Sequence, residues 1–112
     1  MNAGALNRRI QVQRFTETGR NGFGETVGDW LSEGPLLFAS RRDVSDAEKR
    51  IGGGWDNKLV TRFTIRSSPF ARSIRRTDRL SHEGVTFEID GIKEVPPGRA
   101  FIEITAWTGE VL

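Results

Sequence analysis

The stretch of residues 58–92 reads KLVTRFTIRSSPFARSIRRTDRLSHEGVTFEIDGI, and both of its ends alternate between two kinds of side chain. Near its start, one face of an extended chain carries Leu59, Thr61, Phe63 and Ile65. Near its end, one face carries Val85, Phe87 and Ile89. A period of two with β-branched and aromatic residues is typical of a half-buried strand. The stretch therefore predicts two strands that supply the core, joined by a segment rich in arginine.

Shorter alternating segments lie on both sides of this stretch. They predict strands over residues 8–14, 26–31, 36–42 and 101–107, with shorter ones at 78–80 and 92–95. Residues 15–25 are rich in Gly and Thr, and the Asn-Gly pair at residues 21–22 predicts a turn or mobile hairpin loop. The Glu-Gly-Pro sequence at residues 33–35 interrupts the pattern and predicts the end of one strand. The Asp-Gly pair at residues 90–91 predicts a further turn.

One short helix is predicted over residues 45–51. Ser45 can cap its N-terminus, and Glu48 stands at the position of the capping-box partner. The three glycines at residues 52–54 end this helix within about two turns. They follow a helix and lack the Lys-Ser/Thr of a P-loop, so they are interpreted as a plain linker.

Length and composition limit the fold to one domain, residues 1–112, because the chain is long enough for one core and too short for two. About six or seven short antiparallel strands, one short helix and long flexible loops predict a mainly β fold, either a small β-barrel or a sandwich. No apolar run is long enough to cross a membrane, and the N-terminus lacks the apolar segment of a signal peptide. The absence of cysteine excludes disulfides, thiolate zinc sites and a cysteine nucleophile.

Side chains suited to catalysis are few. The single histidine, His82, falls in a predicted turn beside Glu83, where we expect a solvated surface residue. Common metal sites need two or more convergent His, Cys or carboxylate ligands, and no suitable spacing occurs. Trp30 lies in a strand pattern and is expected to be a core or rim anchor rather than a ligand-stacking residue. We therefore expect no enzyme, no metal and no cofactor.

Charge is distributed unevenly along the chain. Residues 58–82 contain seven Lys/Arg against one acid, a local +6, and residues 83–112 contain six acids against two bases, a local −4. One interpretation is scattered, solvated charge, and another is a pair of surfaces for neighbours of opposite sign. Nucleic-acid binding is a third, because arginine outnumbers lysine fourteen to three and binds phosphate bidentately. Against it, no outer face of the predicted strands shows the stacking aromatics of an oligonucleotide-binding barrel.

Several motifs, taken in order, resemble one family. They are Leu6 followed by RRIQVQR at residues 8–14, a Gly-bearing loop, Trp30, Phe38-Ala39, Glu48 in a short helix, RFTIR at residues 62–66, Arg79-Leu80, Gly84 and VTFEIDGI at residues 85–92. In this order and spacing the chain resembles the head–tail joining proteins of tailed bacteriophages, also called head closure, head completion or stopper proteins. The resemblance covers nearly the whole chain. Phe38 departs from it, because relatives often have tryptophan there, and residues 52–54 and 72–76 match no family pattern.

The resemblance implies a structural virion protein of a phage, prophage or gene transfer agent, assembled in the bacterial host cytoplasm and located at the head–tail interface. Members of the family form a ring, dodecameric when assembled, below the portal and adaptor proteins, where they close the DNA channel and dock the tail. The implied partners are portal or adaptor ring proteins, tail proteins, further copies of the chain and packaged DNA, with no membrane. A small basic β-barrel that binds nucleic acid is the alternative function.

Six charged side chains are the candidates for contacts with subunits, partners or the channel: Arg41, Arg42, Glu48, Arg72, Arg75 and Arg76. The first three, together with the predicted helix, would face neighbouring subunits or the channel. The last three would bind acidic partner surfaces or DNA in the channel.

Overall fold

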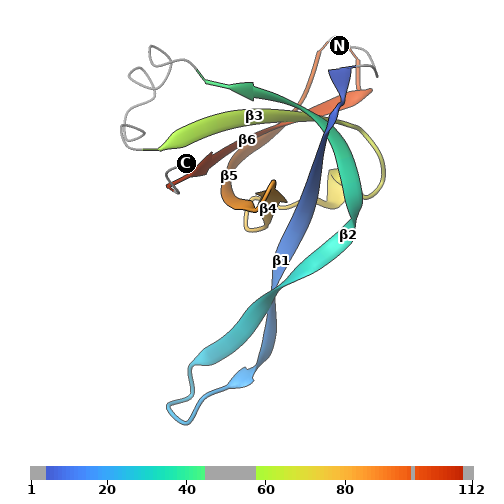
Figure 1. The fold of residues 1–112 in the computed structure, drawn as a ribbon. Helices are drawn as coiled ribbons and strands as arrows, with labels where there is room; N and C mark the ends of the chain where they lie inside the picture. The colour runs from blue at the N-terminus through green and yellow to red at the C-terminus, as the bar shows by residue number, and fades with distance from the viewer. Residues whose placement is uncertain (1–4, 45–57, 97, 110–112) are drawn as a thin grey trace.

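A computed structural model describes residues 5–44, 58–96 and 98–109. Within them the chain forms six strands: β1 (Arg8–Arg20), β2 (Thr26–Asp43), β3 (Leu59–Arg66), β4 (Arg79–His82), β5 (Val85–Glu94) and β6 (Phe101–Thr108). The strands pair antiparallel and close into a barrel in the order β1-β2-β3-β6-β5-β4 (Figure 1). The mainly β prediction is confirmed, with the barrel as the form it takes. In the described ranges no α-helix occurs, and a short 3-10 turn, η2 (Ala71–Ser73), follows β3.

Alternating side chains fill the barrel interior, as the two ends of residues 58–92 predict. The main core members are Ile10, Val12, Ala39, Phe63, Ile65, Leu80, Phe87, Ile89, Ile102, Ile104 and Ala106. Phe63 of β3 and Phe87 of β5 meet edge to face, with ring centroids 5.3 Å apart at an interplanar angle of 87°. This is a favoured aromatic geometry, so the two strands recognised in the sequence meet at the centre of the fold.

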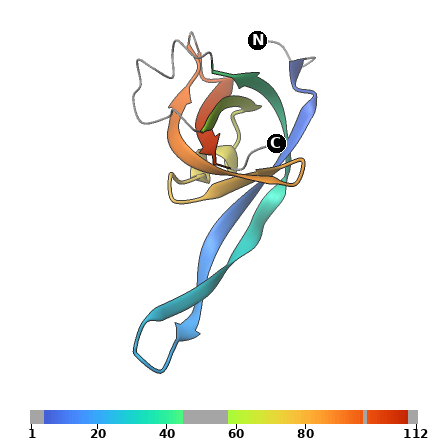
Figure 2. The ribbon, with the colours of Figure 1, turned by 60° about the vertical axis from the view of Figure 1, so that its left-hand side comes forward.

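The hairpin of β1 and β2 extends far beyond the barrel (Figures 1 and 2). We call its projecting part, residues 15–31, the arm. The predicted turn at Asn21-Gly22 is confirmed, but the loop is shorter than residues 15–25, because β1 continues to Arg20 and only residues 21–25 turn. Cross-strand pairing holds this Gly- and Thr-rich segment together, with Phe15 opposite Trp30 and their rings 5.6 Å apart. Gly28 lets the strands approach closely, since a Cβ there would meet the carbonyl oxygen of Thr16.

The predicted break at residues 33–35 is a bulge inside β2 and not the end of a strand. The register passes from Ile10 opposite Leu37 to Val12 opposite Glu33, so two steps along β1 match four along β2. Gly34 takes the left-handed conformation (φ +71°) that such an irregularity needs, and the ring of Phe70 occupies the place of its missing side chain. Likewise, β5 runs through the expected turn at residues 90–91 with a register shift.

Replacing Gly34 with alanine should lower the free energy of unfolding by about 1–3 kcal/mol, because the new Cβ would strain the backbone and push against Phe70. Urea denaturation would measure the loss. The matched control is Gly22→Ala in the arm's turn, where a Cβ meets nothing within 4 Å and φ is not left-handed. A Gly34→Ala protein as stable as the Gly22→Ala protein would contradict this account of the bulge.

His82 is not the surface residue that the sequence predicted. The turn is made by Glu83 and Gly84 alone, both with positive φ (50° and 80°), so His82 ends β4 instead of entering the turn. Its side chain alternates inward with Leu80, is 2% exposed and places its ring 5.4 Å from that of Phe63. Nδ1 lies 3.1 Å from the carbonyl oxygen of Arg9. This histidine therefore packs in the core and links two strands.

The predicted helix over residues 45–51, with Ser45 and Glu48, lies outside the described residues, as do the glycines at residues 52–54. In the described ranges, no helix has the length and apolar character needed to span a membrane.

Candidate assembly surfaces

A basic loop, residues 67–78, leaves the end of β3 and returns to β4; we call it the arginine loop. It is anchored by Asp78, whose side chain is 1% exposed. The Asp78 carboxylate accepts hydrogen bonds from Nε and Nη2 of Arg14, both at 3.0 Å, and from the backbone N–H of Arg75 at 2.9 Å. A two-pronged arginine–carboxylate pair fixes direction as well as distance. Asp78, the single acid of residues 58–82, thus ties the loop to the base of the arm.

Arg14 completes this anchor from β1. Its Nη2 also donates to the backbone carbonyl of Ser73 at 3.2 Å, and Nη1 lies 3.6 Å from the carboxylate of Glu33. The hydrogen bond to Asp78 raises the pKa of the Arg14 guanidinium, outweighing the opposing effect of burial. Arg14 therefore stays charged, and the loop backbone is held in one conformation.

The three predicted arginines of this loop are exposed and sit on the anchored backbone. Arg72 donates from Nη1 to the hydroxyl of Ser67 at 3.0 Å. Across the described ranges, the side chains of Arg75 and Arg76 make no ion pair with a carboxylate. Their charge is therefore available to a partner, on a backbone that needs little ordering when the partner binds.

The structure does not bring the other predicted residues to this loop. Arg41 and Arg42 of β2 pair in register with Phe63 and Arg62, whereas the loop starts after the end of β3. Arg41 is turned inward: its Nε donates to Asp43 at 3.1 Å, and Cζ lies 5.9 Å from the ring centroid of Phe87. Arg42 is exposed on the outer face, and Glu48 lies outside the described residues. The five candidates that the structure describes therefore do not form one site.

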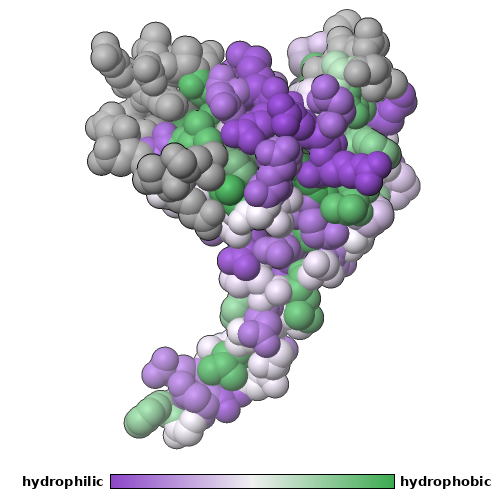
Figure 3. Space-filling view, in the orientation of Figure 1, coloured by the Kyte–Doolittle hydropathy of each residue, from purple (hydrophilic) through white to green (hydrophobic). Residues whose placement is uncertain are grey.

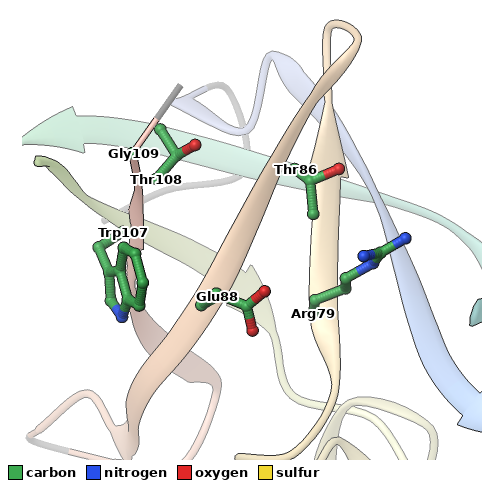
Figure 4. A pocket seen from close by; sticks show the side chains of 6 residues that line it. All are labelled: Arg79, Thr86, Glu88, Trp107, Thr108 and Gly109. Carbon is green, nitrogen blue, oxygen red and sulfur yellow. The ribbon is translucent and has the colours of Figure 1, made fainter. Parts of the chain in front are cut away.

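The outer face of β4, β5 and β6 has an open hollow of about 360 Å³ that the sequence did not predict (Figure 4). Three of its lining residues are aligned across the three strands: Arg79 of β4 pairs with Glu88 of β5, and Glu88 pairs with Trp107 of β6. Trp30 stacks on the guanidinium of Arg79 at 4.3 Å, as a rim anchor would, and Lys58 lies 4.1 Å from the centroid of Trp107. Tryptophan and arginine are enriched among the residues that contribute most to binding at protein interfaces.

Most of the large exposed hydrophobic residues are on or next to the arm. Phe15, Phe23, Val27 and Leu31 lie on it, and Leu36 and Phe38 follow on β2. Figure 3 shows hydrophobic surface along the arm, separated by polar residues. The arm carries three acids against one base, so its net charge is −2, opposite in sign to that of the arginine loop. An acidic, apolar projection and a basic loop are thus held on one barrel.

Among the described residues, no group of three or more His, Cys, Asp or Glu side chains could hold a metal ion. The exposed groups are suited to binding other macromolecules through charge and apolar contact.

Comparisons with known proteins agree with this interpretation. The family model described as "Phage head completion protein" matches residues 1–109. The solution structure of protein SF1141 from Shigella flexneri 2a is 28% identical, covers 97% of each chain and superposes with a TM-score of 0.69. A chain in the virion of a native gene transfer agent particle shares the fold, with 22% identity, coverage of 91% of this chain and 93% of that one, and a TM-score of 0.66. No curated protein matches.

Proposed function

Because this chain belongs to the phage head completion protein family, we propose that it forms a ring at the head–tail interface of a phage, prophage or gene transfer agent particle. Family membership confirms the resemblance found in the sequence, and it makes the chain a structural protein rather than an enzyme. In our proposal the ring sits below the portal and its adaptor, closes the DNA channel and docks the tail. The partners are then portal or adaptor proteins, tail proteins and further copies of this chain.

The observation that best supports a ring is the separation of two unlike surfaces on one rigid barrel. A closed ring is built from head-to-tail contacts, in which each subunit offers two different surfaces to its two neighbours. The acidic arm and the arginine loop, with the Arg14–Asp78 pair between them, meet this requirement. Opposite charges also disfavour wrong pairings, since like surfaces repel each other.

The arginine loop is the surface proposed to meet an acidic partner. Reversing both Arg75 and Arg76 to glutamate changes its charge by −4, and we expect incorporation of the protein into heads that carry the adaptor to fall by roughly tenfold or more. The fold should persist, because Asp78 holds the backbone N–H of Arg75 and not its side chain. Quantifying the protein in purified particles would measure the effect. Circular dichroism and urea denaturation would check the fold.

The matched control is the Arg75→Lys/Arg76→Lys protein, which keeps both charges. It should assemble nearly as well as the original protein if charge is the main requirement. Normal incorporation of the Arg75→Glu/Arg76→Glu protein would overturn the proposed role of the loop.

Contact with DNA is the competing use of the same side chains, and their lack of carboxylate partners within the described part of the chain favours it equally. A free DNA-binding protein would bind duplex DNA at moderate salt and lose affinity steeply as salt rises. The Arg75→Glu/Arg76→Glu change removes two phosphate contacts. It should reduce the magnitude of the negative slope of log affinity against log salt by about 2. Strong DNA binding without incorporation into particles would favour this alternative.

A further inference from the structure

We propose that Phe23, at the tip of the arm, seats in an apolar hollow between β2 and β3 of a neighbouring copy of the chain. The hollow, called here the β2–β3 hollow, is lined by Leu36, Leu37, Phe38, Ile65, Arg66 and Ser68. The inference rests on the ring proposed above. It places the arm of one subunit in a hollow that Ser68, a residue of the arginine loop, helps to line on the next subunit.

The tip of the arm presents Phe23 on a well-organised turn. The side chain is 90% exposed, the highest value among the large hydrophobic residues of the described chain. Below it, the Asn21 side-chain oxygen accepts hydrogen bonds from the N–H groups of Phe23 at 2.8 Å and Glu25 at 3.0 Å. Arg20 donates to the carbonyl of Gly24 at 2.9 Å. An aromatic side chain held out in this way loses little conformational freedom on docking.

The arm cannot bury Phe23 against its own barrel. Two views of the molecule show the arm directed away from the barrel (Figures 1 and 2). An extended strand rises about 3.3 Å per residue, so the segment of β2 from Thr26 to Leu36 separates the tip from the hollow by roughly 30 Å. Any hollow that receives Phe23 therefore belongs to another molecule.

The β2–β3 hollow matches a phenyl ring in size and character. Its volume is about 230 Å³, and a cavity of roughly 150 Å³ is enough to bind benzene. Leu36 and Phe38 at its edge are 55% and 58% exposed, so they remain uncovered in the single chain. A docked aromatic residue would remove apolar surface of both copies from water at once.

Charge favours a second copy of the chain as the occupant. Two arginines border the hollow: Arg66 lines it, and the Arg9 guanidinium lies 5.0 Å from the ring centroid of Phe38. Glu25 shares the turn with Phe23 and Arg20, and Glu17 lies further down β1 opposite Gly28. The arm as a whole has a net charge of −2. Phe23 therefore matches the apolar hollow, and the acidic arm matches the basic border of the hollow. The two members of each pair lie on different parts of the chain, as a head-to-tail contact requires.

A cross-linking experiment tests this contact, because the chain contains no cysteine of its own. In the double variant Gly22→Cys/Leu36→Cys, one thiol is next to Phe23 in the chain and the other is at the edge of the hollow. Phe23 and Phe38 are both kept. Particles assembled with this protein should give a ladder of covalent multimers after oxidation or treatment with a short bis-maleimide. The matched control is Gly22→Cys/Thr86→Cys, whose second thiol lies in the outer hollow on β5 and should leave monomers.

The outcomes separate this inference from the function on which it rests. Protein that never enters particles would contradict the proposed function, whereas incorporated protein without a ladder, or with an equal ladder in the control, would contradict the docking of Phe23. Phe23→Ala should lower incorporation by roughly tenfold or more, and Phe23→Leu by less. If no ladder forms and Phe38→Ala weakens binding of a duplex oligonucleotide, the hollow takes nucleic acid and the proposal is wrong.

Discussion

Replacing Phe63 with alanine should cost about 3–5 kcal/mol of the free energy of unfolding. Phe63 is fully buried, and its ring meets those of Phe87 at 5.3 Å and His82 at 5.4 Å. The barrel is closed, so the strands around the missing ring cannot move together to fill the cavity without breaking register. A domain of this size has roughly 5–15 kcal/mol of stability in total. The variant should therefore unfold at a much lower urea concentration, with a fraction unfolded even without denaturant if the parent is marginal.

The matched control for this prediction is Phe23→Ala, the same chemical change at a side chain that is 90% exposed. It should alter stability by no more than about 0.5 kcal/mol, because surface substitutions away from special features seldom do more. Urea denaturation followed by circular dichroism, with a common slope for the three proteins, gives the comparison. Equal stabilities of the Phe63→Ala and Phe23→Ala proteins would show that β3 is not the centre of the core.

The strands that line the barrel could be read from the sequence because burial imposes a period of two on them. Phe63 and Ile65 are buried on the predicted inner face of β3, although Val60 and Thr64 on its other face are buried as well. The final strand alternates strictly, with Ile102 and Ile104 inside. The arm could not be predicted in this way, since neither face of a projecting hairpin is buried. Its pairing depends on cross-strand contacts such as Phe15 with Trp30, which link residues far apart in the sequence.

Two glycines predicted turns where the structure has irregularities inside strands, because turns and bulges favour the same residue types. Gly34 and Gly91 are typical turn residues, and here both lie inside strands at shifts of register. Only the partner strand decides between the two outcomes, because a bulge is a mismatch in pairing and not a local conformation. The same limit explains His82, whose burial follows from a turn that is one residue shorter than expected.

The sequence indicated the positive charge of residues 67–78 but not the contacts that hold this loop in place. Arg72, Arg75 and Arg76 lie exposed on the arginine loop, whereas Arg41 is half-buried with its guanidinium 5.9 Å from the ring centroid of Phe87. The sequence did indicate that Asp78 forms an ion pair. It is the only acid among the bases of residues 58–82, and nearby positive charges favour the charged form of a carboxylate. Its partner, Arg14, stands 64 positions away, which no local pattern reports.

Replacing Asp78 with alanine should destabilise the protein by about 3 kcal/mol, the lower end of the cost of breaking a buried ion pair, because the side chain of Arg14 keeps 22% of its exposure to water. The change removes an acceptor of three hydrogen bonds, so it should also free the arginine loop from the arm's base and reduce incorporation into particles. The raised pKa of Arg14 means that the folded state favours the charged guanidinium. The stability that comes from the charge of Arg14 is thus complete below the ordinary pKa of arginine and is lost as pH rises through the raised value. The loss on mutation should therefore be constant across the neutral range.

A double-mutant cycle isolates the pair from the loss of packing. Arg14→Ala should cost at least as much as Asp78→Ala, because it leaves a carboxylate that is 1% exposed without its main charged partner. The Arg14→Ala/Asp78→Ala protein should be more stable than the sum of the two losses predicts, by about 1.5 kcal/mol or more. Additive losses, within about 0.5 kcal/mol, would mean that the two side chains act independently. In that case the loop is held by the Asp78 contact with the backbone of Arg75, and its link to the arm contributes nothing.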